Sequence, residues 1–217
     1  EAIAKQLGKS ARISIRVNPD IDAKTHPYIS TGLNENKFGV DLQTAKKMYL
    51  HAKNSSHLEP VGIHSHIGSQ ITDIKPVIEA AKIVANLTRE LKAAQIDIKF
   101  FDVGGGIGIV YGDESEPDLY EYAQGILANL SGLDVTVVCE PGRFIVGNAG
   151  YFLTSVLYEK FNKEKRFVVV DGAMNDLIRP SLYQARHKIF ALSSGKTLCE
   201  CKAEQLRELK FVPCDVV

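Results

Sequence analysis

The chain has 217 residues, in which 26 lysine and arginine residues balance 26 aspartate and glutamate residues. Apolar residues make up 45% and charged residues 24%, an ordinary composition for a globular protein. Because the net charge is zero, no broad basic surface is expected for nucleic acid or an anionic membrane. No apolar run approaches the ~20 residues that span a bilayer, and residues 1–10 lack the apolar core of a secretion signal. We therefore expect neither a nucleic-acid-binding protein nor a secreted or membrane protein.

The cysteines show no pattern of a disulfide framework or a zinc site. They lie at Cys139, Cys199, Cys201 and Cys214, without a CxxC pair or a repeated spacing. This usage fits a reducing, cytoplasmic compartment.

The chain begins with the end of a helix. Ile3 and Leu7 are four residues apart and Gly8 follows, which is how helices finish. The next run, residues 12–18, is β-rich and stops at Pro19, which cannot continue a central strand. We therefore expect the chain to start in the middle of a fold.

Helices and strands then alternate. Asp41 is expected to cap a helix over residues 42–53, and a strand follows over residues 60–67. Asp73 is expected to cap the next helix, with Pro76 in its first turn. The apolar residues of that helix recur at helical spacing: Ile74, Val77, Ile78, Ala81, Val84 and Leu91.

A third strand over residues 98–103, a helix over 118–130 and a fourth strand over 135–139 continue this alternation. It predicts an α/β fold with a parallel sheet, either a (β/α)₈ barrel or a doubly wound sheet. Four such units cannot close a barrel, and an open sheet would leave two unpaired edges. We therefore expect the chain to be a fragment.

The pattern changes near residue 151. Residues 151–161 and 166–171 are β-rich runs joined by the polar residues 162–165, which predicts an antiparallel hairpin. The expected division is a barrel part over residues 1–150 and a β-domain that begins over residues 151–217.

Candidate functional residues follow three of the predicted strands. His64 and His66 stand two apart at a strand end, which suits a metal ion, a stacked cofactor or a simple hydrogen-bonded pair. The glycines of the Asp102-Val-Gly-Gly-Gly106 segment can expose backbone amides to a phosphate or can make only a tight turn, and they match no dinucleotide or P-loop spacing.

The third strand end carries a carboxylate and a guanidinium at short spacing. Glu140-Pro-Gly-Arg143 can form a salt bridge or hold a ligand with a phosphate at one end and a basic ring nitrogen at the other. Pyridoxal phosphate has that form. Later in the chain, Arg179 and Tyr183 can hold a substrate carboxylate or order a surface loop.

These segments occur in the order expected of one enzyme family. They are Arg16-Val-Asn-Pro, Lys37-Phe-Gly, Gly62-Ile-His-Ser-His-Ile-Gly-Ser69, Asp102-Val-Gly-Gly-Gly106, Glu140-Pro-Gly-Arg143 and Met174-Asn-Asp-Leu-Ile-Arg-Pro-Ser-Leu-Tyr183. Over residues 1–200 the chain resembles the fold-type III pyridoxal-phosphate decarboxylases, and the last segment is similar to that of the diaminopimelate decarboxylase family. The resemblance implies a partial (β/α)₈ barrel of alanine-racemase type, followed by the start of a β-domain.

The resemblance also implies pyridoxal 5'-phosphate as the cofactor and decarboxylation of meso-2,6-diaminopimelate to L-lysine and CO₂ as the reaction. His66 would stack on the pyridine ring, and Glu140 would pair with the ring nitrogen so that the ring accepts electrons. The other implied cofactor-binding residues are Ser69, Gly105, Gly106, Pro141, Gly142 and Arg143.

The family works as a homodimer with shared active sites. The resemblance also implies which residues bind the substrate. Arg179 and Tyr183 would hold the distal carboxylate, and Arg143 and Glu200 are further substrate-binding candidates. Cys199 and Glu200 would act in the site of the partner subunit, with Cys199 near the carbon that is reprotonated.

The chain departs from the family pattern in several places, among them residues 202–217, which have no counterpart, and a late tyrosine of the β-domain, which is absent. The family's Schiff-base lysine lies on an early barrel strand that this chain does not contain, and the usual Cys-Glu-Ser segment reads Cys199-Glu200-Cys201. The chain alone is therefore expected to be inactive.

Other functions remain open. A related barrel decarboxylase could act on ornithine, arginine or carboxynorspermidine, although Arg179 argues against a substrate with a cationic distal end. A noncatalytic relative would keep the fold as a binding module. A metal-dependent hydrolase that uses His64 and His66 ranks lowest, because no third ligand is evident after a strand.

Overall fold

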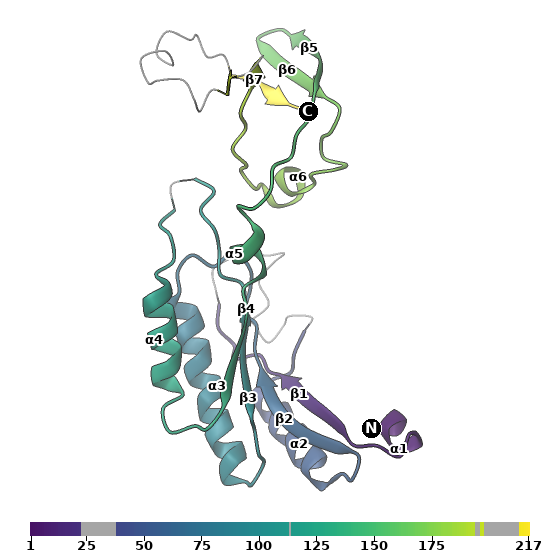
Figure 1. The fold of residues 1–217 in the computed structure, drawn as a ribbon, viewed down its shortest axis with the longest axis vertical. Helices are drawn as coiled ribbons and strands as arrows, with labels where there is room; N and C mark the ends of the chain where they lie inside the picture. The colour runs from purple at the N-terminus through teal and green to yellow at the C-terminus, as the bar shows by residue number, and fades with distance from the viewer. Residues whose placement is uncertain (23–37, 113, 194–195, 198–212) are drawn as a thin grey trace. The chain divides into compact units, whose positions relative to one another are not determined.

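The structure is a computed structural model that describes residues 1–22, 38–112, 114–193, 196–197 and 213–217. These residues form two compact units (Figure 1). The first unit comprises residues 1–110 and 114–149, and the second comprises residues 111–113 and 150–217. Within the described residues, no helix combines the length and the apolar character that crossing a membrane requires.

The first unit is built on a four-stranded parallel sheet whose strands pair in chain order. Its strands are β1 (Ala11–Arg16), β2 (Leu58–His64), β3 (Phe100–Gly105) and β4 (Thr136–Glu140). Its helices are α1 (Ala2–Gln6), α2 (Leu42–Asn54), α3 (Lys75–Ala93), α4 (Leu119–Asn129) and α5 (Gly142–Val146). The predicted α/β alternation is confirmed.

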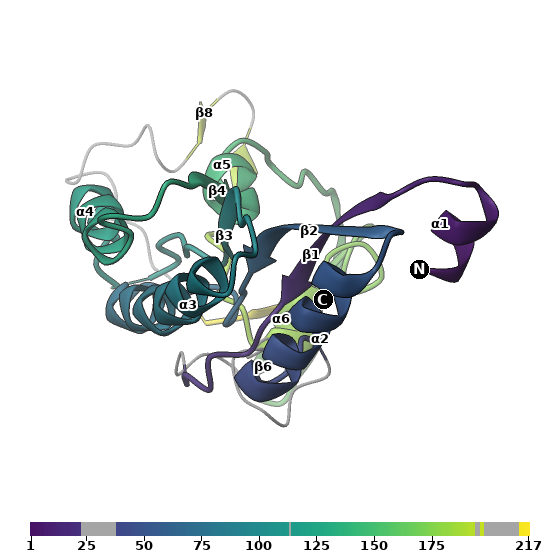
Figure 2. The same cartoon turned by 90° about the horizontal axis from the view of Figure 1, so that it is seen from below.

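Three helices cover one face of this sheet. Figure 2 shows α2, α3 and α4 side by side along that face. A doubly wound sheet carries helices on both faces, whereas a barrel wall carries them only on the outside. The arrangement in the first unit is therefore that of part of a (β/α)₈ barrel.

The core of the first unit lies between this sheet and its helices. Ile63 of β2 and Phe101 of β3 are fully buried, as are Tyr49 of α2 and Val84 of α3. The hydroxyl of Tyr49 donates a hydrogen bond of 2.6 Å to the backbone oxygen of Gly62, which anchors α2 to β2. Burial of apolar side chains at about 25 cal/mol per Å² stabilises this layer.

One of the two predicted helix caps is confirmed and the other is wrong. Asp41 accepts hydrogen bonds from the backbone of Gln43 and Thr44, and Asp118 caps α4 in the same way. The third helix instead has Ile74 at its N-cap position without a side-chain cap, and Asp73 accepts from the N–H of Lys75 at 3.1 Å. Pro76 lies in the first turn as predicted, and because proline has no N–H, one donor fewer needs a cap there.

The second unit contains the predicted hairpin in a shorter form. Strands β5 (Val156–Asn162) and β6 (Lys165–Val170) pair antiparallel, and β9 (Asp215–Val216) lies parallel to β6. The first strand starts at residue 156 rather than 151, and two residues rather than four form the turn. Lys163 adopts φ +54° in this turn, which tightens the connection.

The second unit also contains a short helix, α6 (Arg179–Tyr183), and a small pair of strands, β7 (Leu192–Ser193) and β8 (Lys196–Thr197). The sequence predicted neither α6 nor α5, because each is only five residues long. Helices this short carry too few residues to show a helical period.

Candidate functional site

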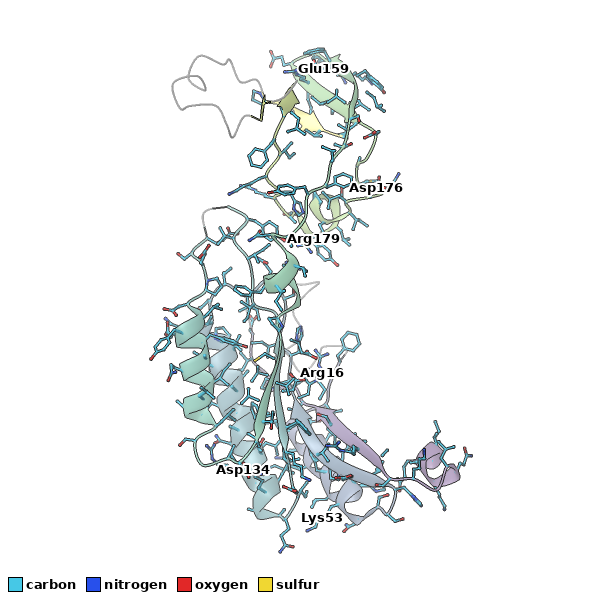
Figure 3. All side chains as sticks on the ribbon, in the orientation of Figure 1. Arg16, Lys53, Asp134, Glu159, Asp176 and Arg179 are labelled. Atoms are coloured by element: carbon cyan, nitrogen blue, oxygen red, sulfur yellow. The ribbon has the colours of Figure 1, made fainter. Side chains whose placement is uncertain are left out.

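The carboxyl ends of the four parallel strands meet at one edge of the first unit. Arg16, His64 and Asp102 occupy one row of the sheet register, and Gly105 pairs with Glu140 in another row nearby. Figure 3 labels Arg16 at the end of β1. Since parallel strands bring their ends to a common edge, the candidate motifs of β2, β3 and β4 converge there.

His66 is held at this edge by two contacts of different origin. Arg16 donates from Nη2 to the backbone oxygen of His66 at 3.2 Å, and the N–H of Gly105 donates to Nδ1 of the ring at 3.2 Å. With Nδ1 as an acceptor, the proton of the neutral ring lies on Nε2. Burial lowers the pKa of His66 and the positive charge of Arg16 lowers it further, so the ring favours the neutral form.

Two residues apart, His64 and His66 would point to the same face of the sheet if the strand continued through both of them. Strand β2 ends at His64, so the alternation of a strand does not extend to His66. His66 owes its position to the contacts with Arg16 and Gly105 instead.

The glycine segment at the end of β3 makes a tight turn that brings three strand ends together. The N–H of Gly104 donates to Oδ1 of Asp102 at 2.8 Å, and Gly104 and Gly106 have φ of +73° and +99°. A Cβ atom on Gly104, Gly105 or Gly106 would lie against the backbone oxygen of Ser65, Glu140 or Gly68, respectively. The glycines are therefore required for this close packing.

Arg143 contacts the segment after β2 through Gln70, a residue that the sequence did not predict to be part of the site. Its Nη1 donates to Oε1 of Gln70 at 3.0 Å. Gln70 also donates from Nε2 to the backbone oxygen of Ile109 at 2.5 Å, and Oε1 accepts from the N–H of Ile109 at 3.3 Å. Gln70 directly follows the predicted site residue Ser69, and that proximity is the only sequence signal for its role.

Glu140 lies close to a second acidic residue. Its Oε2 is 3.6 Å from Nε2 of His64, and its side chain is about half exposed at 52%. Burial raises the pKa of Asp102 and the negative charge of Glu140 raises it further, while the Gly104 N–H and His64 oppose this rise.

Three side chains with potential metal-ligand atoms lie near one another at this edge. Potential ligand atoms of His64, Asp102 and Glu140 all lie within 4.8 Å of one another. This group includes His64 but not His66.

The structure also locates three of the other residues that were predicted to bind the cofactor. Ser69 is half-buried beside Gln70, Pro141 is the N-cap residue of α5, and a Cβ atom on Gly142 would meet no atom within 4 Å. Cys199 and Glu200 lie outside the described residues.

Arg179 and Tyr183 belong to the second unit, where they are neighbours. The Arg179 guanidinium lies 5.4 Å from the centre of the Tyr183 ring and 5.9 Å from that of Tyr111 (Figure 3 labels Arg179). A guanidinium between two aromatic rings is held in place while its edge keeps donors for an anion.

Known proteins resemble this chain closely. The sequence profile of the family described as "Pyridoxal-dependent decarboxylase, pyridoxal binding domain" matches residues 1–147. The chain is 71% identical over 190 residues to the diaminopimelate decarboxylase of Campylobacter jejuni, an alignment that covers 87% of this chain and 47% of that protein. It is 57% identical over 217 residues to the diaminopimelate decarboxylase of Helicobacter pylori, covering 100% of this chain and 51% of that protein.

A solved structure agrees with these sequences. The diaminopimelate decarboxylase of Helicobacter pylori complexed with L-lysine matches with a TM-score of 0.89 at 56% identity, covering 100% of this chain and 51% of that one. The predicted architecture, a partial barrel followed by the start of a β-domain, is thus confirmed. The chain spans about half the length of the curated relatives it matches. Because the family profile matches most of the chain and the convergent strand ends lie inside the matched residues, the chain belongs to the pyridoxal-dependent decarboxylases.

Proposed function

We propose that the full-length protein containing this chain uses pyridoxal 5'-phosphate to decarboxylate meso-2,6-diaminopimelate to L-lysine and CO₂. The observation that carries the proposal is the convergence of His66, Glu140 and Arg143 at the carboxyl ends of β2 and β4. The diaminopimelate decarboxylases of two bacteria, at 71% and 57% identity, support the choice of substrate.

The residues at this edge fit the cofactor. A ligand with a phosphate, a flat ring and a basic nitrogen needs a cation, a face for stacking and a carboxylate. Arg143 supplies the cation, the largely neutral ring of His66 supplies the face, and Glu140 supplies a carboxylate that is about half exposed. Beside Arg143, the space next to Gly142 is open, which leaves room for an anion.

Each residue then has a defined task. Arg143 binds the phosphate together with Ser69, Gly105, Gly106 and Gly142, while Pro141 directs the chain into α5. Glu140 keeps the ring nitrogen protonated through its negative charge. The bound cofactor supplies a ring that accepts the electron pair released when CO₂ leaves the substrate.

Further residues are assigned to substrate binding and proton transfer. Arg179 binds the distal carboxylate of the substrate with Tyr183 beside it, and Glu200 contributes to substrate binding. Cys199 delivers a proton to the carbon that has lost CO₂, across the interface of a homodimer. The Schiff-base lysine belongs to a part of the full-length protein outside these residues, and the cytoplasm is the proposed compartment.

The test is substrate turnover by the full-length protein. Release of CO₂ and formation of lysine from meso-diaminopimelate are expected, with little turnover of ornithine, arginine or carboxynorspermidine. Glu140→Gln should retain the cofactor but lower kcat by ~10²-fold or more, because the ring nitrogen loses its charged partner. A preference for ornithine or arginine would show that the proposed substrate is wrong. The absence of any turnover would indicate a noncatalytic relative.

Arg179→Ala offers a second measurement on the same protein. A guanidinium holds a distal carboxylate and repels a distal ammonium group. The substitution should therefore raise KM for diaminopimelate steeply and narrow the preference over substrates with a distal amine. An unchanged KM would remove Arg179 from the binding site.

A further inference from the structure

His64 has no task in the proposed function, although it lies among the groups that do. It is the last residue of β2 and pairs in register with Arg16 on one side and Asp102 on the other. Its side chain is only 20% exposed, and its Nε2 atom is buried without a hydrogen-bond partner among the described residues. A buried imidazole nitrogen without a partner destabilises the fold, so a nearby acceptor is expected to accept its hydrogen bond.

Two carboxylates lie within reach of this nitrogen, and their situations differ. Asp102 already accepts the N–H of Gly104 at 2.8 Å, a bond that shapes the glycine turn. Glu140 presents Oε2 at 3.6 Å from Nε2 of His64. The terminal torsion of a glutamate is broad, so a small rotation brings this pair to the ~2.8 Å of a charge-assisted hydrogen bond.

We propose that His64 is a positioning residue for Glu140. It donates from Nε2 to the Glu140 carboxylate and thereby restricts the side chain to one orientation, which leaves the second oxygen for the ring nitrogen of the cofactor. An exposed glutamate otherwise samples several rotamers and loses entropy when it binds. This inference rests on the proposed function, because it concerns the residue assigned to the ring nitrogen.

Charged groups on three strands surround the pair. Arg16 of β1 and Glu140 of β4 interact electrostatically, and Asp102 of β3 lies near both His64 and Glu140. His66 also senses the charges of Arg16 and Glu140. Without His64, the two carboxylates would face each other with one donor fewer between them, and repulsion would turn Glu140 away.

The test compares two ligands on the full-length protein: pyridoxal phosphate and its 1-deaza analogue, in which a C–H group replaces the ring nitrogen. Both ligands carry the same aldehyde and phosphate. The dissociation constant of the 1-deaza analogue divided by that of pyridoxal phosphate therefore isolates the contribution of the ring nitrogen, and this quotient is the ratio used below. Glu140→Gln should bring this ratio close to one. His64→Asn, which has no donor at the position of Nε2, should lower the ratio about tenfold, or about 1.4 kcal/mol.

Three further variants separate positioning from folding. His64→Gln, whose amide reaches the position of Nε2, should restore most of the ratio. In the Glu140→Gln background, His64→Asn should change the ratio no further, as expected for residues that act together. His51→Asn changes an exposed histidine of α2 and should leave the ratio as it is.

The outcomes distinguish the two proposals. The inference is overturned if Glu140→Gln lowers the ratio but His64→Asn leaves it unchanged. The same conclusion follows if His64→Asn weakens the binding of both ligands by the same factor, because His64 then has only a structural role. If Glu140→Gln itself leaves the ratio unchanged, the pairing of Glu140 with the ring nitrogen fails, and the role of His64 fails with it.

Discussion

The backbone N–H of Gly105 donates to Nδ1 of His66 across 3.2 Å, which joins the glycine-rich end of β3 to the imidazole that follows β2. This bond makes Nδ1 an acceptor and assigns the proton of the neutral ring to Nε2. A glycine turn that might have served only for packing therefore also orients the side chain assigned to the face of the cofactor.

The first prediction concerns the pH dependence of His66. Its pKa is lowered from the ordinary 6.5 by burial and by Arg16. The native state therefore binds this proton less readily than the unfolded chain. The stability from neutral His66 is present above pH 6.5 and is lost as the pH falls through the lowered pKa. A titration of the His66 ring proton by NMR should give a midpoint below that of the unfolded protein in urea, and a higher midpoint would contradict the assignment.

Gly104→Ala should lower the free energy of unfolding more than Gly132→Ala, although both substitutions introduce similar backbone strain. Gly104 and Gly132 have similar φ of +73° and +76°, but a Cβ on Gly132 meets no atom within 4 Å, whereas one on Gly104 lies against the Ser65 oxygen. Gly132→Ala should cost about 1 kcal/mol from φ alone. Gly104→Ala should cost about 1–3 kcal/mol more from the steric clash. Denaturant unfolding of the full-length protein measures both, and equal costs would show that the turn is loosely packed.

Arg143→Lys should weaken binding of the cofactor through its phosphate. A lysine cannot reproduce the fork of donors and would lose the bond to Gln70 Oε1. The dissociation constant of pyridoxal phosphate should rise by about tenfold, while that of pyridoxal, which lacks the phosphate, should change little. Arg89→Lys on α3, where the guanidinium donates to the Asn129 oxygen, is the control. If both ligands weaken equally, Arg143 does not bind the phosphate.

Tyr49→Phe should lower the free energy of unfolding by about 1 kcal/mol, because it removes a buried hydrogen bond. The Tyr49 hydroxyl donates to the Gly62 oxygen at 2.6 Å, and burial raises its pKa so that it remains a donor. Tyr120→Phe is the matched control, since Tyr120 is 75% exposed on α4. Thermal and denaturant unfolding should separate the two variants, and equal stabilities would mean that the bond contributes nothing net.

The sequence by itself determined the local elements of this protein and the positions of its functional segments. Asp41 caps its helix as predicted, because a carboxylate at the start of a helix satisfies backbone donors close by in the chain. The motifs around His66 and Glu140 also fell at strand ends as predicted, because apolar runs mark the strands and polar residues mark where they stop. These features depend on neighbours within a few residues.

Tertiary structure alone decided which of these residues meet. The pairs Gly105 with His66, Arg143 with Gln70 and His64 with Glu140 join residues 39, 73 and 76 positions apart. Their contacts depend on the register between parallel strands and on glycine turns that let the strand ends approach closely. No local pattern encodes that register, since it results from the packing of whole helices against the sheet. The cap at Ile74 illustrates the same limit, because the path from β2 into α3 overrode the local preference for Asp73.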